Sequence, residues 1–258
     1  MNILFIGDVV GKIGREMVTS SLPSLISRMD VDFTIVNGEN AAAGFGLTPD
    51  NAAELFSAGV NVITSGNHIW RRPELVSRLM NEKAILRPAN YPPFSPGSGR
   101  GIYETKVGKV GVINLLGRIF MDPIDCPFTA VDRELDRLKV ETNVIIVDMH
   151  AEATSEKIAM GYYLDGKVSA VLGTHTHVQT ADERILPNGT AYISDAGMTG
   201  PIDSVIGIKK EIVIKKFITG IPSRFEVADG KAKLEGVLIE VDPSTGRSSK
   251  IKRIQLAE

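Results

Sequence analysis

The first third of the chain alternates between short apolar runs and longer amphipathic segments. Each apolar run has the length of a buried strand, and the segment after it places apolar side chains at helical spacing. Strands are therefore expected at about residues 3–8, 32–38 and 61–67, and helices at about 14–29, 49–58 and 72–80. Thr48 and Pro49 are typical of an N-cap and a first-turn proline. This order predicts strand-helix units that form a sheet.

Hairpins become more frequent in the rest of the chain. The pattern predicts a helix at 129–140, capped by Thr129, and a further helix that ends at Tyr163. The expected strands are 101–105, 109–115, 144–150, 169–172, a hairpin within 182–194, 233–241 and 248–255. Alternation followed by hairpins predicts an α/β fold in which two sheets pack within one domain, residues 1–258.

Polar side chains that could bind metal follow the predicted strands, and they include all 4 histidines of the chain. These residues are Asp8, Glu39, Asn40, Asn67, His68, His150, His175 and His177. In open α/β sheets, ligands bind at the carboxyl ends of the strands. His175 and His177 are alternate residues just past a strand, so we expect both imidazoles on one side of the backbone. A single histidine is usually an ordinary core or surface residue, but the whole set at strand ends favours a site.

Composition and charge narrow the possible partners. The net charge of −2 and the pI of about 6.1 make nucleic acid an unlikely partner. The single cysteine, Cys126, cannot form an internal disulfide, and the N-terminal apolar run has no basic segment before it and is too short to span a membrane. A cytoplasmic protein without a membrane partner is expected.

The glycines after the first strand suggest a phosphate-binding loop, but their spacing does not fit one. The distance from Gly7 to Gly11-Lys12 is one residue short, and Ile13 stands where a serine or threonine is required. These glycines are better explained as a tight turn beside Asp8.

The candidate ligands suit a pair of metal ions better than one structural zinc ion. They are seven in number without His68, they include no thiolate, and a shared carboxylate could bridge two ions. Mixed imidazole and oxygen ligands favour Fe, Mn, Zn or Co over Ca or Mg. Two ions about 3.5–4 Å apart can generate hydroxide at neutral pH and stabilise an in-line displacement. The sequence therefore favours a two-metal hydrolase of phosphate esters.

The order of these motifs resembles the calcineurin-like metallophosphoesterase superfamily. Within it, the chain is similar to the bacterial YmdB-type cyclic-nucleotide phosphodiesterases. The resemblance rests on Gly7-Asp8, Gly38-Glu39-Asn40, Gly66-Asn67-His68, His150, Gly173-Thr174-His175-Thr176-His177 and the segment from Ser194 to Pro201. It implies a four-layer α/β/β/α sandwich of two packed mixed sheets and hydrolysis of 2′,3′-cyclic AMP, with 3′,5′-cyclic AMP as a second substrate.

The resemblance also implies a role for each site residue. One metal would be bound by Asp8, Glu39, Asn40 and His177, and the other by Glu39, Asn67, His150 and His175, with Glu39 bridging. His68 would remain unligated and protonate the leaving oxygen. Val10 replaces the histidine that is usual in the superfamily's first motif, and Glu39 replaces the usual aspartate. Both changes add oxygen character, which favours Fe(II) or Mn(II), with Zn(II) possible.

Several alternatives stay open. Asn40 and Asn67 could be turn residues, and His68 could orient the substrate instead of acting as an acid. Glu152, Glu156 and Lys157 are interpreted as a solvated helix start. Arg100 and Arg118 could bind phosphate from nearby loops, but they are left out because exposed arginines are common. The chain could also be a phosphomonoesterase or a nucleotide-sensing regulator with little turnover, and it could form a homo-oligomer.

Overall fold

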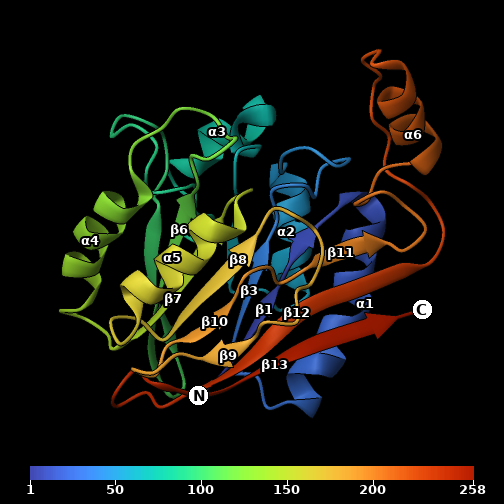
Figure 1. The fold of residues 1–258 in the computed structure, drawn as a ribbon. Coiled ribbons are helices and arrows are strands. Elements are labelled where there is room, and N and C mark those ends of the chain that lie inside the picture. Colours follow the sequence, from blue (N-terminus) through green and yellow to red (C-terminus); the bar gives the residue numbers. More distant parts are fainter.

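Two mixed sheets lie face to face in the computed structural model, which describes residues 1–258 (Figure 1). The first sheet has the order β2-β11-β12-β1-β3-β4, with β13 paired to β12. Its strands are β1 (Asn2–Ile6), β2 (Asp8–Val9), β3 (Phe33–Asn37), β4 (Val62–Thr64), β11 (Met198–Pro201), β12 (Ala232–Val241) and β13 (Ser248–Ala257). The pairs β1-β3 and β3-β4 are parallel and β1-β12 is antiparallel. The polar residues after β3 and β4 therefore lie at one edge of this sheet.

The second sheet has the order β5-β6-β7-β8-β10-β9. Its strands are β5 (Arg100–Thr105), β6 (Gly108–Leu116), β7 (Val144–His150), β8 (Ala170–Thr174), β9 (Arg184–Ile185) and β10 (Ala191–Ile193). The central pairs β6-β7, β7-β8 and β8-β10 are parallel, which places the ends of β7 and β8 side by side.

Helices cover the outer face of each sheet (Figure 1). The helices are α1 (Gly11–Arg28), α2 (Pro49–Ser57), the 3-10 helix η1 (Ile69–Arg71), α3 (Pro73–Leu79), α4 (Pro127–Leu138), α5 (Thr154–Leu164) and α6 (Lys210–Thr219). No helix combines the length and the apolar character that crossing a membrane requires.

Three apolar clusters separate the four layers. In β1, Phe5 packs between the sheets with Ile146, while Leu4 packs outward with Leu22 of α1. Leu135 of α4 belongs to a third cluster, on the outer face of the second sheet. The alternation of side chains along a strand thus buries β1 on both faces. The α/β fold class with two packed mixed sheets is confirmed.

Most predicted elements are present, with three corrections. The Thr48 hydroxyl accepts a hydrogen bond from the Asn51 amide at 3.2 Å, which confirms this cap of α2. The predicted cap Thr129 is wrong, because α4 begins at Pro127 with Cys126 in the N-cap position. The parallel pairing of β2 with β11 and the helix α6 were not expected.

Candidate metal centre

The candidate ligands come together where the carboxyl ends of both sheets meet. In order, Asp8 begins β2, Glu39 and Asn40 follow β3, Asn67 and His68 follow β4, His150 ends β7, and His175 and His177 follow β8. Asp8, Glu39 and His150 are almost completely buried. The structure therefore brings together all eight residues that the sequence singled out.

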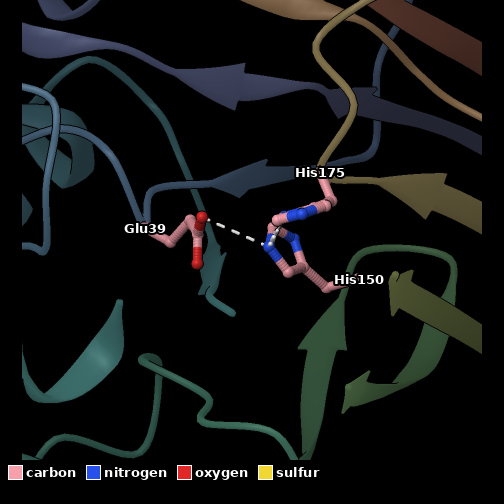
Figure 2. Close-up of side chains that lie close together, drawn as sticks. All are labelled: Glu39, His150 and His175. Carbon is pink, nitrogen blue, oxygen red and sulfur yellow. Dashed lines mark hydrogen bonds and ion pairs between the residues drawn. The ribbon is translucent and has the colours of Figure 1, made fainter. Parts of the chain in front are cut away.

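Glu39, His150 and His175 form the tightest group (Figure 2). One potential ligand atom from each of the three lies within 4.8 Å of the others. His150 Nε2 is 3.2 Å from Glu39 Oε1 and 3.0 Å from His175 Nδ1. Asn67 Oδ1 is 3.2 Å from the same His150 nitrogen. One imidazole pair, one carboxylate and one amide oxygen thus share a small buried space.

A second group lies on the other side of Glu39. His177 Nε2 is 3.6 Å from Asp8 Oδ1 and 3.2 Å from Asn40 Nδ2. The Asn40 amide donates to Glu39 Oε1 at 3.1 Å and to Asp8 Oδ1 at 3.4 Å. Its Oδ1 lies 2.8 Å from His68 Nδ1, so ligation of a cation through this oxygen would require the amide to rotate. Glu39 therefore contacts residues of both groups.

Hydrogen bonds behind the histidines orient the ring nitrogens that face the ligand space. The Thr174 hydroxyl donates to Asp148 at 2.7 Å, so it accepts from His150 Nδ1 at 2.9 Å and holds the ring with Nε2 toward Glu39 and His175. His177 Nδ1 donates to the Ile206 carbonyl at 2.9 Å, which leaves its Nε2 facing Asp8. His175 Nε2 lies 3.1 Å from a Glu152 carboxylate oxygen, which leaves its Nδ1 facing His150.

The pKa values reflect the coupling of carboxylates to imidazoles. Burial raises the pKa of Glu39, but the adjacent His150 and His68 outweigh burial and bring it well below its usual range. Burial lowers the pKa of His150, whereas Glu39 and Asp8 raise it to about 9. Burial and the neighbouring His150 lower the pKa of His175 to about 3. The positive charge of neighbouring imidazoles thus keeps the buried Glu39 carboxylate ionised, and a bound divalent cation would have the same effect.

Asp148 is a buried residue behind the candidate ligands that the sequence analysis missed. Its carboxylate accepts from the Thr64 and Thr174 hydroxyls and from the Asn37 amide, at 2.5, 2.7 and 2.9 Å. Burial raises the pKa of Asp148 to about 6, against the opposing effect of His150. Asp148 lies two residues before His150 on β7, and this spacing on a strand was a signal for a shared face.

His175 and His177 both direct their imidazoles at the site, as expected, but the backbone that carries them is not extended. Their φ angles are 100° and 62°, a region that is unfavourable for side chains other than glycine. The turn is held by Asp195, which accepts from the Thr176 amide at 3.0 Å and its hydroxyl at 2.6 Å. Both imidazoles reach the site from left-handed backbone, as is common at functional sites.

The interpretation of Glu152, Glu156 and Lys157 as a solvated helix start is correct for Glu152, which is exposed, and wrong for Glu156 and Lys157. Lys157 is 1% exposed, and its ammonium lies 3.2 Å from Asp195. Glu156 is buried and accepts from the Arg118 amide at 3.1 Å, and Glu152 contacts His175. Lys157 and Glu156 hold the loops around the site through these contacts. The local sequence does not indicate that either side chain is buried.

An open cavity of about 280 Å³ lies over these groups. Its polar lining comes from His68, Glu152 and four of the candidate ligands, Glu39, Asn40, His175 and His177. Its apolar lining includes Phe45, Ile206 and Phe225. The Phe45 ring packs edge-on against His68 with 5.1 Å between centroids. A polar floor beside an apolar wall suits a small molecule that carries both charge and a flat ring.

Comparison of folds identifies the class of protein. The chain superposes on a solved NAD nucleotidase from Haemophilus influenzae with a TM-score of 0.63 at 15% identity, over 99% of this chain and 55% of that one. It superposes on a structure described as a novel phosphatase from Mycoplasma pneumoniae with a TM-score of 0.94 at 40% identity, over 100% and 94% of the two chains. The chain therefore shares its four-layer α/β/β/α fold with both of these structures.

Sequence comparison then identifies the family. The profile of the YmdB-like proteins matches residues 4–254. The chain is 50% identical over 254 residues to the 2′,3′-cyclic-nucleotide 2′-phosphodiesterase of Bacillus subtilis, which covers 98% of this chain and 96% of the relative. The chain belongs to the YmdB-like protein family.

Proposed function

We propose that this chain is a dinuclear-metal phosphodiesterase that hydrolyses cyclic nucleotides, with 2′,3′-cyclic AMP as the first substrate and 3′,5′-cyclic AMP as the second. The observation that carries the proposal is the position of Glu39, which contacts a ligand group on each side of it. The similarity to a 2′,3′-cyclic-nucleotide 2′-phosphodiesterase supports the choice of substrate.

The donor set fits two divalent ions. Asp8, Glu39, Asn40 and His177 would hold one, and Glu39, Asn67, His150 and His175 the other. Three imidazole nitrogens that face the ligand space and two buried carboxylates match Fe(II) or Mn(II), and Zn(II) is the alternative. When bound, such ions supply a hydroxide nucleophile at neutral pH and neutralise charge on the phosphoryl group.

In this proposal His68 acts as the general acid. Its backbone amide donates to Glu39 Oε2 at 3.1 Å, and its Nδ1 lies 2.8 Å from Asn40 Oδ1. Nε2 is then the nitrogen left for a proton that goes to the leaving ribose oxygen. Because His68 lines the cavity beside Phe45, a base bound against the apolar wall would place the ribose near this imidazole.

Metal-reconstituted protein tests the proposal. Protein stripped of metal and reloaded with Mn(II), Fe(II) or Zn(II) would be assayed on 2′,3′-cyclic AMP, 3′,5′-cyclic AMP and p-nitrophenyl phosphate, with bound metal counted. We expect cleavage of the cyclic diesters with about two ions per chain. Two bound ions with cleavage of the monoester alone would support a phosphomonoesterase, which the similarity to a described phosphatase favours. Absence of bound metal would overturn the proposal.

A further inference from the structure

A second cavity, of about 330 Å³, lies away from the metal centre between α4 and the loop of residues 87–99. None of the residues that line it lines the cavity at the metal centre. Its charged side chains are Arg87, Arg100, Arg133, Arg137 and Glu134. Four guanidinium groups and one carboxylate give a local charge of +3, in a chain whose net charge is −2.

Glu134 cannot neutralise these arginines. Its two oxygens lie 2.7 Å from Arg100 Nε and 2.9 Å from Arg133 Nε, and Arg137 Nη1 is 3.7 Å away. One negative charge is therefore shared among three guanidinium groups. Both Nη groups of Arg100 and the Nη2 group of Arg137 remain as donors, because Arg100 bonds to Glu134 through Nε and Arg137 approaches it through Nη1.

Arg87 gives the cavity a rigid wall. It is only 7% exposed and has no carboxylate partner. Its Nη1 donates to the Pro88 carbonyl at 2.7 Å, and its Nε donates to the Pro96 carbonyl at 3.2 Å. Burial lowers its pKa from the usual range, although Glu134 opposes this effect. A buried guanidinium bonded only to carbonyls leaves its positive charge uncompensated.

From this geometry we propose that the second cavity binds a small phosphate-bearing anion. Guanidinium groups bind phosphate oxygens through paired N–H donors, and four arginines line this cavity, with Arg87 and Arg100 tied to neighbouring groups by hydrogen bonds. A volume of about 330 Å³ accepts either free phosphate or a mononucleotide, and Tyr91 in the lining offers a ring against which a base can stack. The inference rests on this cavity and is independent of the metal centre.

Binding to the Mn(II)-loaded full-length chain tests the inference. Isothermal titration with inorganic phosphate and with adenosine 5′-monophosphate would be compared between wild type and the double variant Arg100→Gln/Arg137→Gln. We expect affinity at this site to fall by about tenfold for each guanidinium removed. Inhibition of diester hydrolysis by phosphate reports binding at the metal centre, and its constant should not change. Tighter binding of the nucleotide would identify a mononucleotide ligand, and equal binding would identify free phosphate.

Two further variants control the interpretation. Glu134→Gln removes the only negative charge in the cavity and should tighten anion binding, whereas Arg28→Gln, an exposed arginine in the last turn of α1, should leave it unchanged. Arg137→Gln alone changes a side chain that is 57% exposed, so it tests the site even if the double variant does not fold. Equal anion affinities of wild type and Arg137→Gln would overturn the inference. So would a wild-type protein that binds the anion only at the metal centre, where binding inhibits hydrolysis.

Discussion

At the scale of single residues, the candidate site depends on which atom of each side chain faces the ligand space. His150 presents Nε2 because Thr174 engages Nδ1, and His177 presents Nε2 because the Ile206 carbonyl engages Nδ1. Glu39 contacts Asn40 in one group of candidate ligands and His150 in the other, so its loss affects both groups. Two predictions follow from these positions.

Replacement of Glu39 by glutamine should remove metal binding and turnover. Glutamine keeps the shape of the side chain but loses the charge that holds two cations. Metal affinity and activity should therefore fall by more than the about 10–100-fold that is typical when a hydrogen-bond partner of a metal ligand is replaced. Metal analysis and initial rates on a cyclic diester measure both effects. Glu240→Gln, which alters an exposed pair with Lys250, serves as the control. Wild-type rates with two bound ions would refute a bridging role for Glu39.

Replacement of His68 by alanine should leave the metals in place and lower kcat by about 10²–10⁴-fold. Alanine keeps the backbone amide that donates to Glu39 and loses only the imidazole with its contact to Asn40. The change therefore removes a proton donor and spares the proposed metal ligands. Metal content and kcat would be measured on the same sample. An unchanged kcat would exclude His68 from proton transfer.

At the scale of elements, two segments are shaped by contacts with distant parts of the chain. The turn after β8 keeps His175 and His177 in left-handed backbone because Asp195 binds Thr176. Lys157 of α5 contacts the same Asp195 and the Thr174 carbonyl, so α5 and the turn form one unit.

Replacement of Lys157 by methionine should destabilise the fold by about 3–5 kcal/mol, because it leaves a buried carboxylate without its partner. Chemical denaturation measures the change. Adding Asp195→Asn should recover part of the loss, since no uncompensated charge then remains. If the two single changes simply add, the pair is not coupled.

The cap of α2 makes a smaller contribution. Thr48→Ala removes the hydroxyl that accepts from the Asn51 amide, and we expect a loss of about 1 kcal/mol in the free energy of unfolding. Thr48→Ser keeps the acceptor and should retain most of the stability. Equal losses in both variants would show that the methyl group, and not the cap, matters.

At the scale of the whole molecule, the candidate centre lies between the two sheets. Asp8, Glu39 and Asn67 follow or begin strands of the first sheet, while His150 and His175 belong to the second. Ions bound there would link the sheets in addition to the apolar cluster that packs between them.

Removal of metal should therefore lower the melting temperature. An ion present at 100 times its Kd stabilises a fold by about 2.7 kcal/mol, which in a chain of this size raises Tm by about 5 °C or more. Scanning calorimetry with and without a chelator measures the difference. The Glu39→Gln protein should show no such difference, and a shift that survives in this variant would place the stabilising ion elsewhere.

The sequence by itself determined the elements and the chemistry of the candidate site. Hydrophobic periodicity records which side of a strand or helix is buried, so most elements were predicted, and Thr48 was correct because a cap depends on neighbouring residues. The concentration of histidine, carboxylate and amide residues after strands indicated the site, because the ends of parallel strands lie along one edge of a sheet.

Only the tertiary structure decided which distant residues support that site. In the sequence, Lys157 and Arg87 look like ordinary solvated charges, because burial of a charge depends on contacts with remote segments. The pairing of β2 with β11 joins residues far apart in the chain, and no local pattern specifies it. The left-handed turn at His175 and the arginine cavity beside α4 likewise arise from long-range packing, which residue periodicity does not record.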